Sequence, residues 1–125
     1  MSKTRCLLLT ALVASATLAC EDAGLGPNGS GGDFTITIGS GLNPTYSWSA
    51  GPAFEVSVFR ANGVTPAWVV ADPLNEAITS PVTHGTVPGN ATELVDNEKT
   101  LTAGVRYEVT VKLANGDEAF REFTR

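Results

Sequence analysis

The feature that most constrains the fold is a run of alternating side chains near the end of the chain. From Arg106 to Leu113, polar and apolar residues alternate at every position. A period of two places one set of side chains on each face of an extended strand, so the run predicts a strand with one buried and one solvated face. Tyr107 is the first apolar residue of the run, and Leu101 and Gly104 precede it by six and three positions.

A leucine, a turn glycine and a tyrosine entering an alternating strand form the pattern of a tyrosine corner, in which the phenol hydroxyl ties the incoming loop to the strand. Leu101, Gly104 and Tyr107, with the valines that follow, resemble the end of a fibronectin type III domain. Trp48, followed by a proline-bearing loop, is similar to the same family. The resemblance covers most of residues 34–125 and implies an all-β, immunoglobulin-like antiparallel sandwich of about seven strands.

The other strands are predicted from short β-rich runs between turn residues, at positions 34–38, 45–49, 54–59, 68–70, 78–82, 91–95 and 118–124. Pro66 and Pro73 flank Trp68–Val70, which predicts a short edge strand there. Asn115-Gly116 is a type I′ turn signal between the last two strands.

The expected core consists of the inward residues of both sheets: Ile36, Ile38, Tyr46, Trp48, Val56, Val58, Leu101, Tyr107, Val109 and Val111. In the last strand, Phe120 and Phe123 are three positions apart and cannot share one face of a regular strand. Either a bulge near Arg121 or one exposed phenylalanine is therefore expected.

The start of the chain has the organisation of a leader. Lys3 and Arg5 precede an uncharged apolar run, residues 6–19, that ends at Cys20. As a helix this run would reach about 21 Å, short of a bilayer core of about 30 Å, so a cleaved signal peptide over residues 1–19 is expected instead of a spanning helix. Residues 17–20 (Thr-Leu-Ala-Cys) are similar to a lipobox, which implies acylation of Cys20 and its exposure as the mature N-terminus.

Cysteine use agrees with lipid attachment. Cys6 would leave with the leader, so the mature chain would hold Cys20 alone and no internal disulfide partner. Export to the cell envelope with a lipid anchor in a membrane, the outer membrane where the cell has one, is the expected location. Ordinary signal-peptide cleavage and secretion is the alternative. Residues 20–33 are expected to be a lipidated N-terminus and a flexible linker, because residues 21–32 contain five glycines.

The net negative charge of the chain argues against some classes of partner. The chain has eight basic and thirteen acidic side chains, and loss of the leader removes Lys3 and Arg5. A negative balance argues against nucleic acid as a partner and against electrostatic adhesion to anionic lipid.

Candidate catalytic and metal-binding residues are few. His84 is the only histidine and lies in a loop rich in proline and glycine, whereas nucleophilic catalysis needs a base oriented beside its nucleophile. Zinc sites use about four His or Cys ligands, and the pair Asp96 and Glu98 falls short of a calcium loop. A non-catalytic protein without metal or cofactor is expected.

The expected function is a binding or structural module displayed at a membrane, with an unidentified protein or glycan partner. The loops at 50–53 and 114–117 are expected to meet at the end where the chain enters the domain. The candidate contact residues in them are Ala50, Gly51, Pro52, Asn115, Gly116 and Asp117. Addition of a partner strand along Trp68–Val70 is a second mode.

Two other functions remain open. An inhibitor or accessory subunit of an envelope enzyme would expose an aromatic or arginine anchor among the clustered loops. A carbohydrate-binding module would expose Trp68 on a flat face, whereas core packing would bury it.

Overall fold

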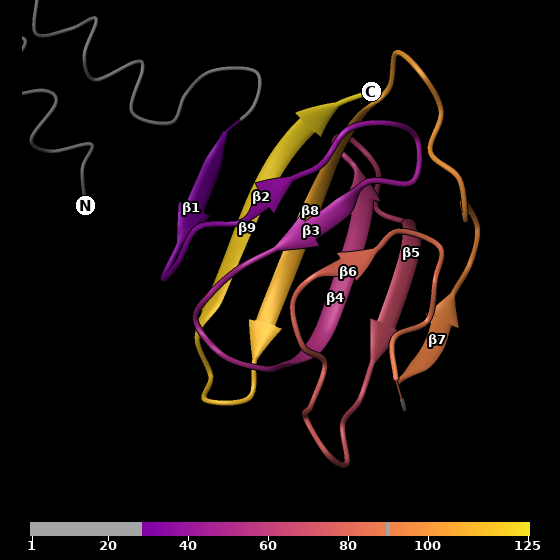
Figure 1. Ribbon diagram of the computed structural model, residues 1–125. Coiled ribbons are helices and arrows are strands. Elements are labelled where there is room, and N and C mark those ends of the chain that lie inside the picture. Colours follow the sequence, from indigo (N-terminus) through magenta and orange to yellow (C-terminus); the bar gives the residue numbers. More distant parts are fainter. Residues whose placement is uncertain (1–28, 90) are drawn as a thin grey trace, which may run out of the picture.

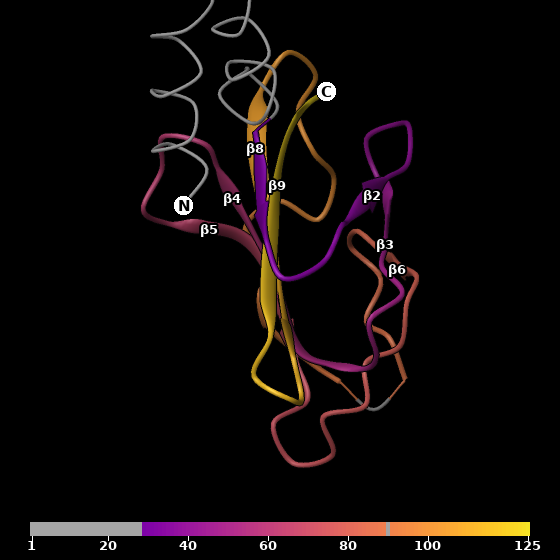
Figure 2. The same cartoon turned by 90° about the vertical axis from the view of Figure 1, so that its left-hand side faces the viewer.

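The computed structural model describes residues 29–89 and 91–125, which fold into two facing antiparallel β-sheets (Figure 1). The strands are β1 (Ser30–Gly32), β2 (Thr37–Ile38), β3 (Thr45–Ser47), β4 (Ala53–Arg60), β5 (Pro66–Ala71), β6 (Val82–Thr83), β7 (Thr92–Val95), β8 (Arg106–Leu113) and β9 (Glu118–Thr124). One sheet has the order β1-β9-β8-β4-β5-β7 and the other β2-β3-β6. Figure 2 shows the smaller sheet covering one face of the larger. The predicted all-β antiparallel fold is confirmed.

The predicted alternating strand lies inside the larger sheet. It is β8, which pairs with β4 on one side and β9 on the other. Val109 and Val111 face the smaller sheet opposite Val58 and Val56 of β4, and all four are fully buried. Because every second residue of both strands is apolar, their pairing forms a continuous buried strip.

The core lies between the two sheets. Its buried apolar residues are Ile36, Tyr46, Trp48, Ala53, Val56, Val58, Ala67, Trp68, Val70, Ile78, Val82, Leu101, Tyr107, Val109, Val111, Leu113, Ala119 and Phe123. Of the expected core, only Ile38 differs, because it is partly buried and packs against this cluster from β2.

Tyr107 makes the contact expected of a corner tyrosine. Its hydroxyl oxygen accepts a hydrogen bond from the Thr102 backbone N–H at 2.8 Å. Leu101 beside Thr102 is buried, and Gly104 has φ +83°, which glycine adopts without strain. The loop before β8 is therefore tied to the strand, as predicted.

The predicted linker ends earlier than expected, because Ser30–Gly32 form β1 at the edge of the larger sheet. The Glu122 N–H donates to Gly29 O at 2.7 Å, and the Asp33 N–H donates to Glu118 O at 2.9 Å. Gly32 has φ +107°, and a Cβ there would overlap the backbone of the facing strand. The glycine-rich composition of this segment predicted a linker, but in the fold these glycines allow β1 to approach β9 closely.

The prediction of an edge strand at Trp68–Val70 is wrong. These residues belong to β5, which lies between β4 and β7. The segment at 91–95, predicted as a strand, supplies β7 and covers the edge of β5. Strand addition along Trp68–Val70 is consequently blocked by the chain itself.

The last hairpin is confirmed, but its turn is not type I′. The Leu113 N–H donates to Asp117 O at 2.8 Å, which encloses a three-residue loop. Gly116 has φ +96°, whereas Asn115 keeps a negative φ and its Oδ1 accepts from the Asp117 N–H at 2.8 Å. This is the three-residue hairpin loop with a left-handed glycine at its end.

The alternatives for Phe120 and Phe123 resolve in favour of an exposed phenylalanine. β9 pairs with β8 without a register shift, Phe123 is buried, and Phe120 is 36% exposed.

The segments predicted at 34–38 and 78–82 form shorter strands than expected, β2 and β6. Ile78 makes only an isolated bridge, to Ala53.

Candidate functional site

The loops predicted to form a contact surface do meet at one end of the sandwich. The β3–β4 loop (residues 49–52) and the β8–β9 turn (residues 114–117) are joined by the Ala114 N–H, which donates to Pro52 O at 3.1 Å. The Trp48 indole N–H donates to Gly51 O at 2.7 Å, so a core residue also holds the first loop. Ala50, Gly51 and Pro52 are exposed, as are Asn115 and Gly116, and Asp117 is half-buried.

A third segment, which sequence reasoning missed, joins this end. Residues 72–77 follow β5, and Ala53 and Ile78 exchange backbone hydrogen bonds of 2.8 and 2.9 Å. Asp72 is buried, and its carboxylate accepts from the backbone N–H groups of Asn75 at 3.2 Å and Ala77 at 3.4 Å. The turn it holds exposes Leu74 at 92%. Asp-Pro before Leu-Asn is a turn signal that would have identified it.

We call these three segments the loop end; they lie together at the bottom of Figure 1. Acidic residues surround them: Asp33, Glu76, Asp117 and Glu118. The Glu118 N–H donates to Asp33 Oδ2 at 3.1 Å, which places Asp33 beside the β8–β9 turn. Lys112, near the end of β8, lies 3.8 Å from Glu55. The surface of the loop end therefore carries mainly negative charge, with a few exposed apolar side chains.

Trp68, the remaining candidate contact residue, does not reach the surface. Its side chain is fully buried, and its indole N–H donates to Glu93 Oε2 at 2.7 Å. This hydrogen bond is the main reason why the pKa of Glu93 lies below its ordinary value. Because Trp68 belongs to the core, the basis for a carbohydrate-binding module is absent.

His84 is buried at the junction of the two sheets. Its Nε2 lies 2.6 Å from Glu98 O and its Nδ1 lies 2.9 Å from the Tyr46 hydroxyl. A carbonyl oxygen only accepts hydrogen bonds, so Nε2 carries the proton and the Tyr46 hydroxyl donates to Nδ1. Burial lowers the pKa of His84, which agrees with this neutral form. Both nitrogens are engaged in structural contacts, and the ring also packs against Trp68 at 4.8 Å between centroids.

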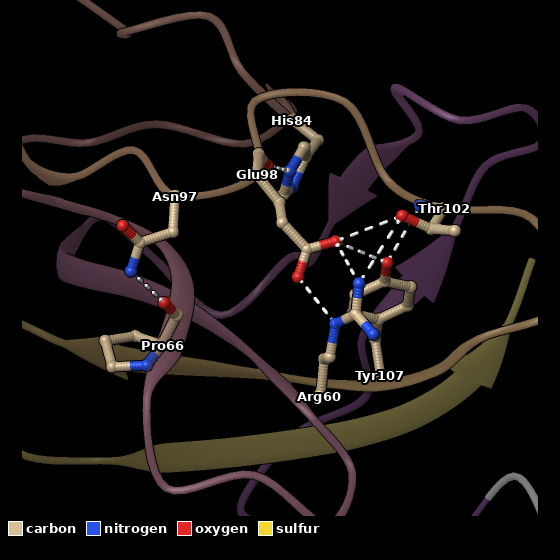
Figure 3. Close-up of polar contacts among 7 residues, drawn as sticks. All are labelled: Arg60, Pro66, His84, Asn97, Glu98, Thr102 and Tyr107. Atoms are coloured by element: carbon tan, nitrogen blue, oxygen red, sulfur yellow. Dashed lines mark hydrogen bonds and ion pairs between the residues drawn. The ribbon is translucent and has the colours of Figure 1, made fainter.

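Glu98 connects the loop before β8 to three strands, and Figure 3 shows its carboxylate contacts with Arg60 of β4 and Tyr107 of β8. Arg60 binds its carboxylate through two nitrogens at 2.7 and 3.0 Å, and the Tyr107 hydroxyl donates to Oε1 at 2.8 Å. The Glu98 backbone N–H donates to Ala67 O at 2.8 Å. The hydrogen bond from Arg60 is the main cause of the lowered pKa of Glu98. Since its backbone oxygen also accepts from His84, this residue links both sheets.

The ionisable groups of the interior are thus used to hold the fold. Within residues 29–89 and 91–125, every buried side-chain nitrogen and oxygen has a hydrogen-bond partner. In the same ranges, no three His, Cys, Asp or Glu side chains gather in a way that would hold a metal ion. Asp96 is exposed, and the carboxylate of Glu98 is occupied by Arg60, Thr102 and Tyr107.

Cys20, the predicted lipidation site, and the predicted leader lie outside the described residues. The part of the chain that the structure describes contains no helix of a length and apolarity that would span a membrane. Comparison of the chain with protein-family models, with curated protein sequences and with solved structures gives no match.

Proposed function

We propose that this protein is a lipid-anchored cell-envelope protein that carries one non-catalytic, fibronectin type III-like module, with the loop end as its contact surface. The leader and Cys20 supply the anchor, and acyl chains contribute about 0.8 kcal/mol of membrane affinity per buried methylene. The corner hydrogen bond of Tyr107 and the buried Trp48 support the fibronectin type III-like assignment.

The observation that carries the binding role is the joining of three loops by backbone hydrogen bonds. Pro52 O accepts from Ala114, and Ala53 pairs with Ile78, so the ties from one loop to the next are made by backbone groups. A rigid scaffold that displays exposed side chains on short loops is the usual arrangement of a binding surface. The side chains exposed there include Ala50, Leu74 and Asn115, a composition that supports a display module over an enzyme inhibitor with an aromatic or arginine anchor.

The anchor is tested by Cys20→Ala, with Cys6→Ala as the matched control inside the leader. Cys20→Ala is expected to move the protein from the membrane fraction to the soluble fraction and to abolish incorporation of a radioactive fatty acid. Cys6→Ala is expected to change neither readout. Undiminished labelling of the Cys20→Ala protein would contradict the proposal.

The contact surface is tested separately with Leu74→Asp in the full-length protein. Because Leu74 is 92% exposed, the substitution is expected to leave stability within about 0.5 kcal/mol. Loss of the envelope proteins that co-purify with the unmodified protein would support the loop end as the contact surface. Co-purification of the same proteins in the same amounts would argue against it.

A further inference from the structure

Strand β1 gives the N-terminal segment a direction relative to the sandwich. It runs antiparallel to β9, with Ser30 opposite Arg121 and Gly32 opposite Ala119. Glu118, at the start of β9, lies beside the loop end. The backbone at Gly29 and Ser30 therefore points toward the other end, where β9 finishes at Thr124. The predicted domain, from residue 34, does begin beside the loop end, because Asp33 pairs with Glu118, and it is the unpredicted β1 that carries the preceding chain to the other end.

As a flexible coil, the segment between the proposed anchor and the domain is shorter than the domain is long. Nine residue steps separate Cys20 from Gly29, equivalent to about 16 Å as a flexible coil and about 30 Å when extended. The eight residues of β8 span roughly 26 Å. A lipid on Cys20 would thus hold the end of β9 close to the membrane surface.

That end carries three arginines, and we call it the arginine end: Arg60, Arg106, Arg125 and the β4–β5 turn (residues 61–65). Arg60 and Arg106 line one depression of about 360 Å³, with Val105 as an apolar wall. Their side chains are 48% and 45% exposed although each also binds a glutamate. Val64, in the turn beside the depression, is 93% exposed.

Arg125 lines a second depression at this end, of about 440 Å³, together with Leu42. Its Nη1 donates to Gly39 O at 2.7 Å and to Gly41 O at 3.0 Å, so the contacts that position it are to carbonyl oxygens. Its guanidinium also lies 5.0 Å from the ring centre of Phe123. The guanidinium is held in place while its charge remains available to an anion.

We propose that the arginine end lies against the phospholipid headgroups of the membrane, and that the loop end consequently faces away from it. Guanidinium groups suit phosphate because they present several N–H donors in one plane, and Val64 is placed to enter the interface. The acidic residues of the loop end disfavour the reverse orientation at an anionic surface. This inference rests on the proposed lipid anchor.

The negative net charge of the chain does not oppose this orientation. At physiological salt the screening length is about 8 Å, whereas the two ends are separated by roughly 26 Å along β8. A membrane at the arginine end therefore experiences the charges of that end, where Glu98 and Glu122 pair with Arg60 and Arg106, and Arg125 hydrogen-bonds to carbonyl oxygens. The net charge of the sequence is a sum over both ends, which the fold holds apart.

The experiment uses the acylated full-length protein reconstituted into vesicles of phosphatidylglycerol and phosphatidylcholine with a headgroup-attached quencher. A fluorophore is placed on Asn62→Cys at the arginine end or on Ala50→Cys at the loop end; both positions are exposed and residues 29–125 contain no other cysteine. Because the ends are roughly 26 Å apart, quenching at position 62 is expected to exceed that at position 50 by at least about twofold.

A matched pair of substitutions sharpens the test. Val64→Asp is expected to remove most of the excess quenching at position 62, whereas Leu74→Asp, at an equally exposed aliphatic residue of the loop end, is expected to leave it unchanged. Equal quenching at positions 62 and 50 in floated vesicles, or equal effects of the two substitutions, overturns the orientation. Protein that does not float with the vesicles overturns the lipid anchor, and with it the inference.

Discussion

The two ends of the sandwich are both made of short connections between strands, but they are held together in different ways. At the loop end, backbone groups hydrogen-bond from one loop to the next, as between Ala114 and Pro52. At the arginine end, backbone bonds such as the one from the Ala61 N–H to Arg106 O are joined by a side-chain network of Arg60, Glu98 and Tyr107. The side-chain network fixes the arginine end while leaving the side chains of Arg60 and Arg106 about half exposed, whereas at the loop end the ties between loops run mainly through the backbone.

The largest expected effect comes from breaking the side-chain network at the arginine end. Tyr107→Phe removes the acceptor of the Thr102 N–H and the donor to Glu98. Because both partners are partly buried, we expect the free energy of unfolding to fall by about 2 kcal/mol, measured by urea denaturation. Amide exchange should accelerate at Thr102 and stay unchanged at Ala114 of the loop end. An unaltered denaturation midpoint would show that Tyr107 does not act as a corner tyrosine.

The corresponding change at the loop end is smaller, because one side chain there holds only its own turn. Asp72→Ala leaves the backbone N–H groups of Asn75 and Ala77 without their carboxylate acceptor. A loss of about 1 kcal/mol is expected, together with faster amide exchange confined to residues 74–77. If exchange at Thr102 accelerates to the same extent, the two ends are not independent.

A third substitution tests the strand that orients both ends. Gly32→Val places a side chain against the backbone of β9 at φ +107°, so β1 should detach. We expect the Glu122 N–H, which donates to Gly29 O, to lose its protection from hydrogen exchange while global stability falls by at most about 1 kcal/mol. Gly63→Ala is the control, because a Cβ there meets only ordinary contacts. Retained protection at Glu122 would mean that β1 tolerates the side chain.

The smallest effect concerns pH and the histidine between the sheets. Burial lowers the pKa of His84 from its ordinary 6.5, so below that pH the unfolded chain binds a proton that the folded chain does not. Stability should therefore decrease as the pH falls below 6.5, until the folded imidazole is itself protonated. Glu98, whose pKa is lowered by Arg60, adds a further loss below its ordinary 4.5. His84→Gln should flatten the upper part of this dependence in urea titrations, and an unchanged slope would contradict it.

Local sequence patterns predicted the strands that have one buried face and one solvent-exposed face. The alternation in β8, the tyrosine tie and the final hairpin follow from residues close in the sequence. The shape of the hairpin turn did not follow from Asn115-Gly116, because the Asn115 side chain binds the Asp117 backbone and selects a longer loop. The turn at residues 72–77, which the Asp72 carboxylate holds, could have been predicted from the Asp-Pro pair.

Predictions that failed concerned pairing between distant segments. Ser30–Gly32 have the composition of a linker, and only the edge of β9 makes them a strand. Trp68 was assigned to an edge because prolines flank it, yet β7 pairs with β5 from a segment more than twenty residues later. His84 does lie in a turn, as predicted, but its complete burial against Tyr46 and Glu98 was not foreseen.

By itself the sequence determined that the chain would form half-buried antiparallel strands with a corner tyrosine, because period-two patterning and turn residues act over a few positions. The tertiary structure decided which strands lie at the edges, which aromatic and histidine side chains are buried, and how charge divides between the two ends. Those properties depend on contacts between residues that are far apart in the chain, and a sum of charges or a local composition contains no information about them.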